Sequence, residues 1–295
     1  WKPVYHFKEM EPIKTLIFSL YHDLACKYLG LLLMRGDISI SNLSFSYPDG
    51  TDALNALTFD VSEKESVAIL GPNGAGKTTL VMHLNGIYSI QKGSICIGNK
   101  EINTDNLKEI RKNVGIVFQD PDQQLFMPSV YEDVIFGPRN FGFNVLETEE
   151  NAKKALQQVG MYEHKDKAPH HLSLGQKRKV AIASVLASKP KIVIFDEPSS
   201  NLDPSSRREL IDIIKSLDAT ILLVSHDIPL ALELCPRTIV LKDGNLLCDM
   251  QTNEFLGDDL LMKEARVELP FGFELHHKFH HIAEGGEQPK HRHSD

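Results

Sequence analysis

The chain has 295 residues, and 42% of them are hydrophobic, which is enough for one large α/β domain or two modest ones. Its formal charge is −8 and no long basic run occurs, which argues against nucleic acid as a partner. The four cysteines are scattered without a C-x-x-C pair, so we expect reduced thiols in a reducing compartment.

Residues 1–35 form an N-terminal extension. The chain begins with Trp1, and Met34 directly precedes the first predicted strand, so Met34 is a candidate for the natural start. Apolar residues recur at helical spacing in the extension, but polar residues interrupt them and no signal-peptide cleavage site is present. Two interpretations stay open: a surface or artefactual helix, and a helix that docks on a membrane.

The following segment predicts a β-rich region. Residues 38–70 alternate in the manner of antiparallel strands with a turn at Asp49-Gly50. Residues 95–102 indicate a second hairpin around Gly98-Asn99.

A glycine-rich run, GPNGAGKTT, lies between a strand-like stretch at 66–70 and a helix-like stretch at 80–87. Its G-x-x-x-x-G-K-T spacing is typical of a phosphate-binding loop, whose glycines let successive N–H groups point into one concavity at a helix N-terminus. Lys77 is expected to reach the β- and γ-phosphates, and the Thr78 hydroxyl to ligate Mg²⁺. An ordinary turn is the alternative. The residues predicted to bind ATP are Gly71, Pro72, Asn73, Gly74, Ala75, Gly76, Lys77, Thr78 and Thr79.

The middle of the chain predicts helices. From about residue 128 to 186 the pattern is helical, with apolar residues on one helix face in 149–159 and in 176–186. Apolar runs at 191–195 and 220–225 then predict buried parallel strands, and Asp243-Gly244 predicts a closing hairpin.

Two carboxylates follow the apolar run in KIVIFDEP, residues 191–198. Asp196 suits Mg²⁺ coordination, and Glu197 is placed to polarise a water for in-line attack on the γ-phosphate. Solvated acids also commonly cap strand ends, which is the competing interpretation.

Three further segments resemble one family. A strand ending at Gln119 is predicted by VGIVFQDPDQQLF. A helix starting at a Ser-x-Gly-Gln turn is predicted by LSLGQKRKVAIASVLA. A strand ending at His226 is predicted by ILLVSHD. In order and spacing they resemble the ATPase subunit of ABC transporters, over about residues 37–250. The resemblance implies an α/β P-loop NTPase fold with a RecA-like parallel-sheet core, an antiparallel β subdomain and a helical subdomain. It places the ATP-binding domain at 36–268 and the helical subdomain at about 120–187.

The resemblance also implies roles for single residues. Gln119 is expected to act on Mg²⁺ and to sense a membrane partner, His226 to bond the γ-phosphate, and Tyr47 to stack on adenine. The expected catalytic residues are thus Glu197, His226 and Gln119, and the expected Mg²⁺ ligands are Thr78, Gln119 and Asp196. Taken singly, a glutamine, histidine or tyrosine at such a position is more often a packing or surface residue.

The segment LSLGQ corresponds to the family signature. The resemblance implies that Ser173, Gly175 and Gln176 contact the γ-phosphate bound by a second copy, and that Asp203 lies in a loop linking the two sites. Leu174 replaces the commoner glycine, but the serine and the glycine that make the family's contacts are present. Because each motif occurs once, we expect a second ATPase subunit, either a copy of this chain or a paralogue.

The C-terminal tail, 269–295, is rich in histidine. On a helix, His276 with His280 and His277 with His281 would form i, i+4 pairs that can chelate Ni²⁺, Co²⁺, Cu²⁺ or Zn²⁺. A polar tail with incidental histidines is the alternative.

The run FQDPDQQLFMPSVYEDVIFGPRNFG closely resembles the ATPase of energy-coupling-factor importers, and LS-x-GQK-R-VAIA resembles the cobalt and nickel branch. This implies a motor at the cytoplasmic face of the cell membrane, with a transmembrane coupling subunit and a substrate-capture membrane protein as partners. Residues 120–124 would lie near the coupling contact, or form only a polar turn.

Three rival functions remain. The motor could serve a vitamin-type importer of the same class. It could be a soluble ABC ATPase acting on DNA or ribosomes, although no long coiled coil or second cassette is seen and the charge is acidic. It could also be a metal-binding regulator that uses the ATP site as a sensor.

Overall fold

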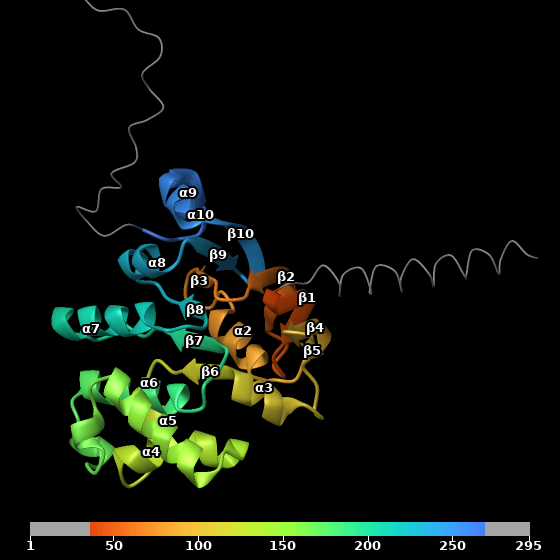
Figure 1. Ribbon diagram of the computed structural model, residues 1–295. Coiled ribbons are helices and arrows are strands. Elements are labelled where there is room, and N and C mark those ends of the chain that lie inside the picture. The colour runs from red at the N-terminus through yellow and green to blue at the C-terminus, as the bar shows by residue number, and fades with distance from the viewer. Residues whose placement is uncertain (1–35, 269–295) are drawn as a thin grey trace, which may run out of the picture.

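The computed structural model describes residues 36–268 (Figure 1). The predictions for the extension before residue 36 and for the histidines of the tail, His276, His277, His280 and His281, lie outside the described residues.

A six-stranded sheet forms the centre of the molecule, in the order β10-β9-β3-β8-β7-β6. Five of its strands, from β9 to β6, run parallel, and β10 pairs antiparallel with β9 at the edge. The bounds are β3 (Ser66–Leu70), β6 (Val114–Val117), β7 (Ile192–Asp196), β8 (Thr220–Val224), β9 (Arg237–Lys242) and β10 (Asn245–Gln251). The parallel strands and the Asp243-Gly244 hairpin are therefore as predicted.

A four-stranded antiparallel sheet in the order β2-β1-β4-β5 packs beside it. Its strands are β1 (Gly36–Ser46), β2 (Asp52–Ser62), β4 (Lys92–Ile97) and β5 (Lys100–Glu101). Both predicted hairpin turns are present. One expectation was wrong, because β3 does not continue the antiparallel pattern of the preceding strands: it pairs parallel with β8 and β9. Its uninterrupted apolar sequence, SVAIL, suits a strand that is covered on both faces.

Helices cover the sheets and form a separate block. Helices α4, α5 and α6 pack on one another beyond the edge strand β6, at the bottom of Figure 1. The bounds of the helices are α2 (Lys77–Leu84), α3 (Leu107–Asn113), α4 (Val130–Phe141), α5 (Val145–Gln158), α6 (Leu174–Leu186), α7 (Pro204–Lys215), α8 (Ile228–Leu234), α9 (Thr252–Gly257) and α10 (Asp259–Glu264), with short 3₁₀ turns at Pro121–Gln123, Tyr162–His164 and Pro169–His171. This arrangement confirms the α/β fold class. Between residues 36 and 268, none of the helices has the length and apolar character that a membrane span requires.

The central sheet is buried on both faces, and each face belongs to a different core. Along β7, Ile194 packs with the core under the antiparallel sheet, whereas its neighbour Phe195 packs with the core under the helices. Successive strand residues point to opposite faces, so an unbroken apolar run is what such a strand requires.

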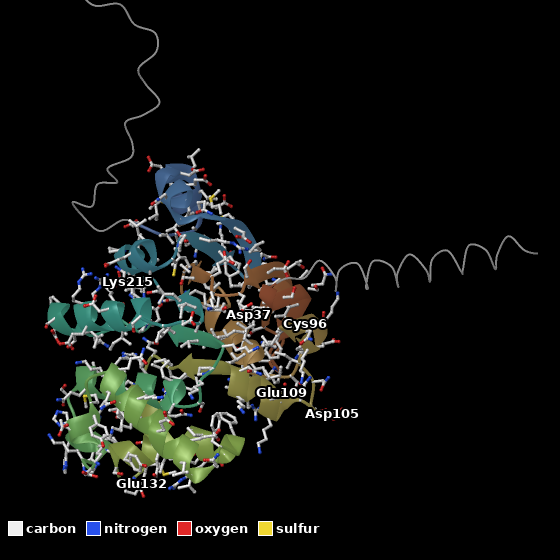
Figure 2. All side chains as sticks on the ribbon, in the orientation of Figure 1. Asp37, Cys96, Asp105, Glu109, Glu132 and Lys215 are labelled. Carbon is white, nitrogen blue, oxygen red and sulfur yellow. The ribbon has the colours of Figure 1, made fainter. Side chains whose placement is uncertain are left out.

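A polar contact joins the two sheets at their border. Asp37 of β1 lies near the centre of the molecule, between the two sheets (Figure 2). The Thr220 hydroxyl, fully buried at the start of β8, donates to Asp37 Oδ2 at 2.5 Å and accepts from the Lys64 N–H at 2.7 Å. Buried polar groups need such partners, and here they fix the antiparallel sheet against the central one.

Helix α6 lies close to β6 because Gly115 has no side chain. A Cβ atom there would meet Val185 Cγ1 at 2.3 Å and Pro190 Cγ at 3.3 Å. The branched valine and the proline ring cannot turn away, so the distance between helix and strand depends on this glycine.

We predict that Gly115→Ala lowers the free energy of unfolding by about 1–3 kcal/mol, the usual effect of overpacking. Urea unfolding followed by circular dichroism measures it. Gly257→Ala is the matched control, since a Cβ there meets nothing within 4 Å. Equal midpoints for the two variants would contradict the close approach.

Candidate functional site

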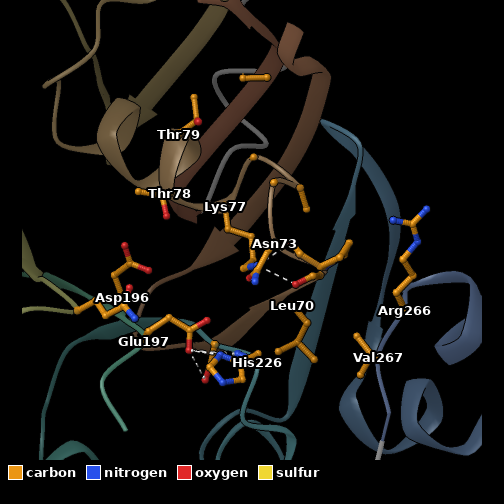
Figure 3. A pocket seen from close by; sticks show the side chains of 18 of the residues that line it. Leu70, Asn73, Lys77, Thr78, Thr79, Asp196, Glu197, His226, Arg266 and Val267 are labelled. Atoms are coloured by element: carbon orange, nitrogen blue, oxygen red, sulfur yellow. Dashed lines mark hydrogen bonds and ion pairs between the residues drawn. The ribbon is translucent and has the colours of Figure 1, made fainter. Parts of the chain in front are cut away.

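A cavity of about 730 Å³ opens beside the ends of β3, β7 and β8 (Figure 3). Because β3, β7 and β8 are parallel, residues that follow their carboxyl ends meet at one edge of the sheet. The cavity brings together predicted residues from far-apart segments, namely Tyr47, Gly71, Pro72, Asn73, Gly74, Ala75, Gly76, Lys77, Thr78, Thr79, Gln119, Asp196, Glu197 and His226.

The glycine-rich loop crosses from β3 to α2 along one wall. Gly71 has φ 141°, and a Cβ on it would lie 2.1 Å from the Leu241 carbonyl oxygen of β9. Gly76 has φ 98°, and its Cβ would lie 2.5 Å from the Ala53 carbonyl oxygen of β2. Glycine is therefore required at both ends of the loop by the backbone packed against it.

Lys77 is the first residue of α2, and its side chain is only 7% exposed. Its Nζ donates to the carbonyl oxygens of Gly71 at 2.7 Å and Pro72 at 3.0 Å. Burial lowers the pKa of Lys77, while the charges of Glu197 and Asp196 raise it. A buried cation at a helix N-terminus is a strong attractor for phosphate.

Asp196 and Glu197 stand at the end of β7, facing Lys77 across the cavity (Figure 3). Burial raises the pKa of Asp196, and so does the charge of Glu197, while Lys77 and the Thr78 hydroxyl lower it. The expected strand ends at Gln119 and His226 come two residues earlier, at Val117 and Val224, so those two side chains extend from loops.

Glu197 occupies a strained backbone position. Its φ is 47°, in the left-handed region that costs a residue other than glycine about 1 kcal/mol or more. Its N–H donates to the Val224 carbonyl at 2.8 Å, and its Oε2 accepts from the Ser225 hydroxyl at 3.3 Å and the His226 N–H at 3.3 Å. His226 Nδ1 lies 2.7 Å from the same oxygen. The loop that follows β8 thus holds the carboxylate in place.

Tyr47 lines the cavity at the turn between β1 and β2. Its hydroxyl shares a hydrogen bond of 2.8 Å with Thr79 Oγ1, and its ring packs edge-on against Phe45 and Tyr88. The ring is therefore oriented by α2 and by its aromatic neighbours, and its stacking on adenine stays a prediction.

The signature residues do not line the cavity. Ser173 is the N-cap of α6 and forms a capping box with Gln176: the Gln176 N–H donates to Ser173 Oγ at 3.3 Å, and the Ser173 N–H donates to Gln176 Oε1 at 3.0 Å. A Cβ on Gly175 would lie 2.8 Å from Ser206 Oγ of α7. Within one subunit, the side chains of Ser173 and Gln176 therefore stabilise the start of α6.

Asp203 is likewise separate from the cavity and caps α7. It accepts from the N–H groups of Ser205 and Ser206, both at 3.0 Å, and from the Ser206 hydroxyl at 2.6 Å. These bonds, led by the one from the Ser206 side chain, lower the pKa of Asp203. The capping role has a clear sequence signal, since Asp-Pro is a frequent helix start, and a linking role between sites stays a prediction.

Several cavity residues were not predicted from the sequence. Ser225 directly precedes His226, and its position beside a strand end is the signal that could have found it. Arg266, Val267 and Glu268 also line the cavity, in and after the turn that ends α10, where Arg266 has φ 53°. No local pattern marks them, because they reach the cavity only through the packing of α10.

The donor set decides which ions suit this cavity. Thr78, Asp196 and Gln119 offer oxygen ligands, which suit Mg²⁺ shared with phosphate oxygens. In residues 36–268 no group of three His, Cys, Asp or Glu side chains is placed to hold a metal ion by itself. The cavity therefore favours a phosphate ester accompanied by a hard cation over a permanently bound transition metal.

Comparisons with known proteins agree with this chemistry. A family model described as ABC transporter matches residues 54–200. A putative ABC transporter ATP-binding protein of Streptomyces avermitilis is 55% identical over 237 residues, which cover 80% of this chain and 90% of the relative. The energy-coupling factor transporter ATP-binding protein EcfA of Methanothermobacter thermautotrophicus is 44% identical over 238 residues, covering 79% of this chain and 76% of the relative.

Solved structures share the architecture. That of cbiO1 from Clostridium perfringens, part of the ABC transporter complex cbiONQ, has a TM-score of 0.70 and 37% sequence identity, covering 78% of this chain and 94% of the other. A dimeric ATP-binding cassette, MJ0796 bound to ADP and Pi after hydrolysis, has a TM-score of 0.66 and 27% identity, covering 73% and 98% of the two chains.

We predict that Lys77→Ala weakens ATP binding by about ten- to a hundredfold, the effect of losing one charged hydrogen bond to phosphate. Isothermal titration calorimetry with Mg²⁺ and ATP measures the dissociation constant. Lys154→Ala is the matched control, because this lysine pairs on the surface with Glu150 of α5, away from the cavity. The same dissociation constant in wild type and Lys77→Ala would remove the phosphate role of the loop.

Proposed function

The chain belongs to the ABC transporter family of ATP-binding cassettes, whose ATP hydrolysis is coupled to transport, and on this premise we propose that it is the motor subunit of an energy-coupling-factor importer. We propose cobalt or nickel ions as the cargo. The importer class is supported by the likeness to EcfA and to cbiO1 and by the resemblance of residues 118–142 to such importers, whereas the metal cargo is supported only by the resemblance of LS-x-GQK-R-VAIA to the cobalt and nickel branch and by the histidine-rich tail.

The observation that carries the motor role is the cavity that joins the glycine-rich loop to the carboxylates of β7. The loop N–H groups and Lys77 would bind the phosphates, and Tyr47 would hold the adenine. We assign Glu197 as the general base, since its carboxylate is fixed at the cavity wall and contacts His226. Thr78, Asp196 and Gln119 would hold Mg²⁺, which neutralises phosphoryl charge when it is bound.

The cavity of one chain lacks the signature residues, which supports action as a pair. Ser173, Gly175 and Gln176 lie at the start of α6, outside the cavity, so they would complete the site of a second subunit. The dimeric relative bound to ADP and Pi supports such a pairing for this chain. The partner is proposed to be a second copy or a paralogue, with Asp203 near the contact between the two sites.

The loop after Gln119 offers a contact for a transmembrane coupling subunit. Phe126 and Phe136 are 64% and 42% exposed, and their rings pack edge-on at 5.1 Å between centroids. Such an exposed aromatic pair is typical of an interaction surface. Of the residues expected near this contact, Pro121 is buried and Gln124 bonds into α6, so Asp120, Asp122 and Gln123 are the ones that face outward. The subunit would work at the cytoplasmic face of the membrane, beside a substrate-capture protein.

We predict that Glu197→Gln keeps ATP binding but lowers the turnover rate by about 10²–10⁴-fold, because the amide cannot accept the proton of the attacking water. The variant should accumulate an ATP-bound dimer, seen by size-exclusion chromatography. Glu150→Gln, on the exposed face of α5, is the control. Normal steady-state hydrolysis by Glu197→Gln would remove this assignment.

The cargo is tested by uptake of radiolabelled Ni²⁺ and Co²⁺ at nanomolar concentration in the native host. We expect cells with Glu197→Gln to lose uptake of one of these ions, while cells with the intact protein keep it. Unchanged uptake of both, in a host without a second importer, would reject the metal cargo. Loss of vitamin uptake in that host would then favour the vitamin-type importer.

A further inference from the structure

Arg178 is a buried charge that the proposed chemistry does not use. It lies in α6 with 2% of its surface exposed, where burial lowers its pKa and the charge of Asp120 raises it. Within residues 36–268 no carboxylate is close enough to form an ion pair with it. Its guanidinium instead donates to two backbone carbonyl oxygens, those of Phe118 at 3.2 Å and Ser200 at 3.3 Å. Burying a guanidinium without a directly bonded carboxylate is costly, so its position needs an explanation.

The two carbonyls belong to loops that carry cavity residues. Phe118 directly precedes Gln119 and follows the end of β6. Ser200 lies between Glu197 and Asp203, in the loop that follows β7. Strands β6 and β7 are neighbours in the sheet, so the guanidinium spans the carboxyl ends of two adjacent strands. One side chain of α6 thus bonds to both loops.

A second residue ties the same loop to α6. The Phe118 N–H donates to Gln124 Oε1 at 3.2 Å, and Gln124 Nε2 donates to the Ala181 carbonyl at 2.8 Å and to Ser184 Oγ at 3.0 Å. Both backbone groups of Phe118 are therefore held by side chains that belong to α6 or bond to it. The residue before Gln119 must follow any movement of this helix.

We propose that Arg178 is a positioning residue that links the movement of α6 to Gln119 and to the loop that leads to Asp203. This rests on the proposed function, because α6 begins with the residues that would meet a partner's nucleotide. When those residues engage, the guanidinium carries the shift of α6 to the Gln119 side of the cavity. Without it, the Ser200 loop loses its bond to α6 and the Phe118 loop keeps only the bonds through Gln124, so the closed pair holds the reacting groups less well.

The test compares full-length Arg178→Lys and Arg178→Met with wild type. Lysine keeps the charge but lacks the planar fork whose two terminal nitrogens each bond one carbonyl, and methionine keeps most of the volume without the charge. We expect kcat to fall about ten- to a hundredfold, the usual size of coupling between sites, with the dissociation constant for ATP unchanged. Arg208→Met is the control, since Arg208 of α7 is exposed and pairs with Glu233.

A double-mutant cycle with Gln119→Ala separates positioning from simple stability. If Arg178 acts through Gln119, its substitution should lower kcat much less in the Gln119→Ala background than in wild type. Unchanged kcat, additive losses in the cycle, or a loss of kcat that merely follows the unfolding midpoint would each overturn the proposal.

A failure of the proposed function would give results that differ from a failure of the Arg178 proposal. If wild type does not hydrolyse ATP, or Glu197→Gln does not pair when ATP is bound, the composite site itself is rejected. If both behave as expected and Arg178→Lys and Arg178→Met turn over normally, only the role of Arg178 is rejected.

Discussion

Burial of both faces of the central sheet is the constraint on which the rest of the structure depends. Because β3, β7 and β8 are apolar in their interiors, they carry polar side chains only at their first or last residues and in the loops that follow them. Parallel pairing brings those ends to one edge, so the glycine-rich loop, the acids after β7 and His226 meet there. The site is thus a consequence of how the core is covered, since no polar side chain could stand inside the strands without a partner.

Segments whose chemistry is local could be predicted from the sequence. The glycine-rich loop, the acids at the end of β7 and the hairpin turns depend on neighbouring residues, so their patterns are readable. The parallel pairing of β3 was missed because it depends on partners more than a hundred residues away, such as Leu222 opposite Val67. Arg266 was missed for a similar reason, because only the packing of α10 brings it to the cavity.

The site stores strain and charge before any nucleotide arrives. The Glu197 N–H bonds to Val224 at the end of β8 with the backbone of Glu197 in the left-handed region, and its carboxylate is held by the loop that follows β8. Lys77 is buried with its ammonium bonded to carbonyl oxygens of its own loop, across the cavity from Asp196. Groups fixed in advance need little rearrangement when phosphate binds, which is the condition under which buried charges act most strongly on a reacting centre.

Two residues proposed to act where a second subunit binds already have a structural role in the single subunit. Ser173 caps α6 and Asp203 caps α7, and both caps satisfy N–H groups that each helix start leaves free. A cap of this kind satisfies only some of the four N–H groups that are free at every helix start. The helix dipole at that end also favours an anion. The start of α6 is therefore stable alone and still attractive to a phosphate brought by another subunit. The residues that start a helix in one subunit can thus also form half of a phosphate site that two chains share.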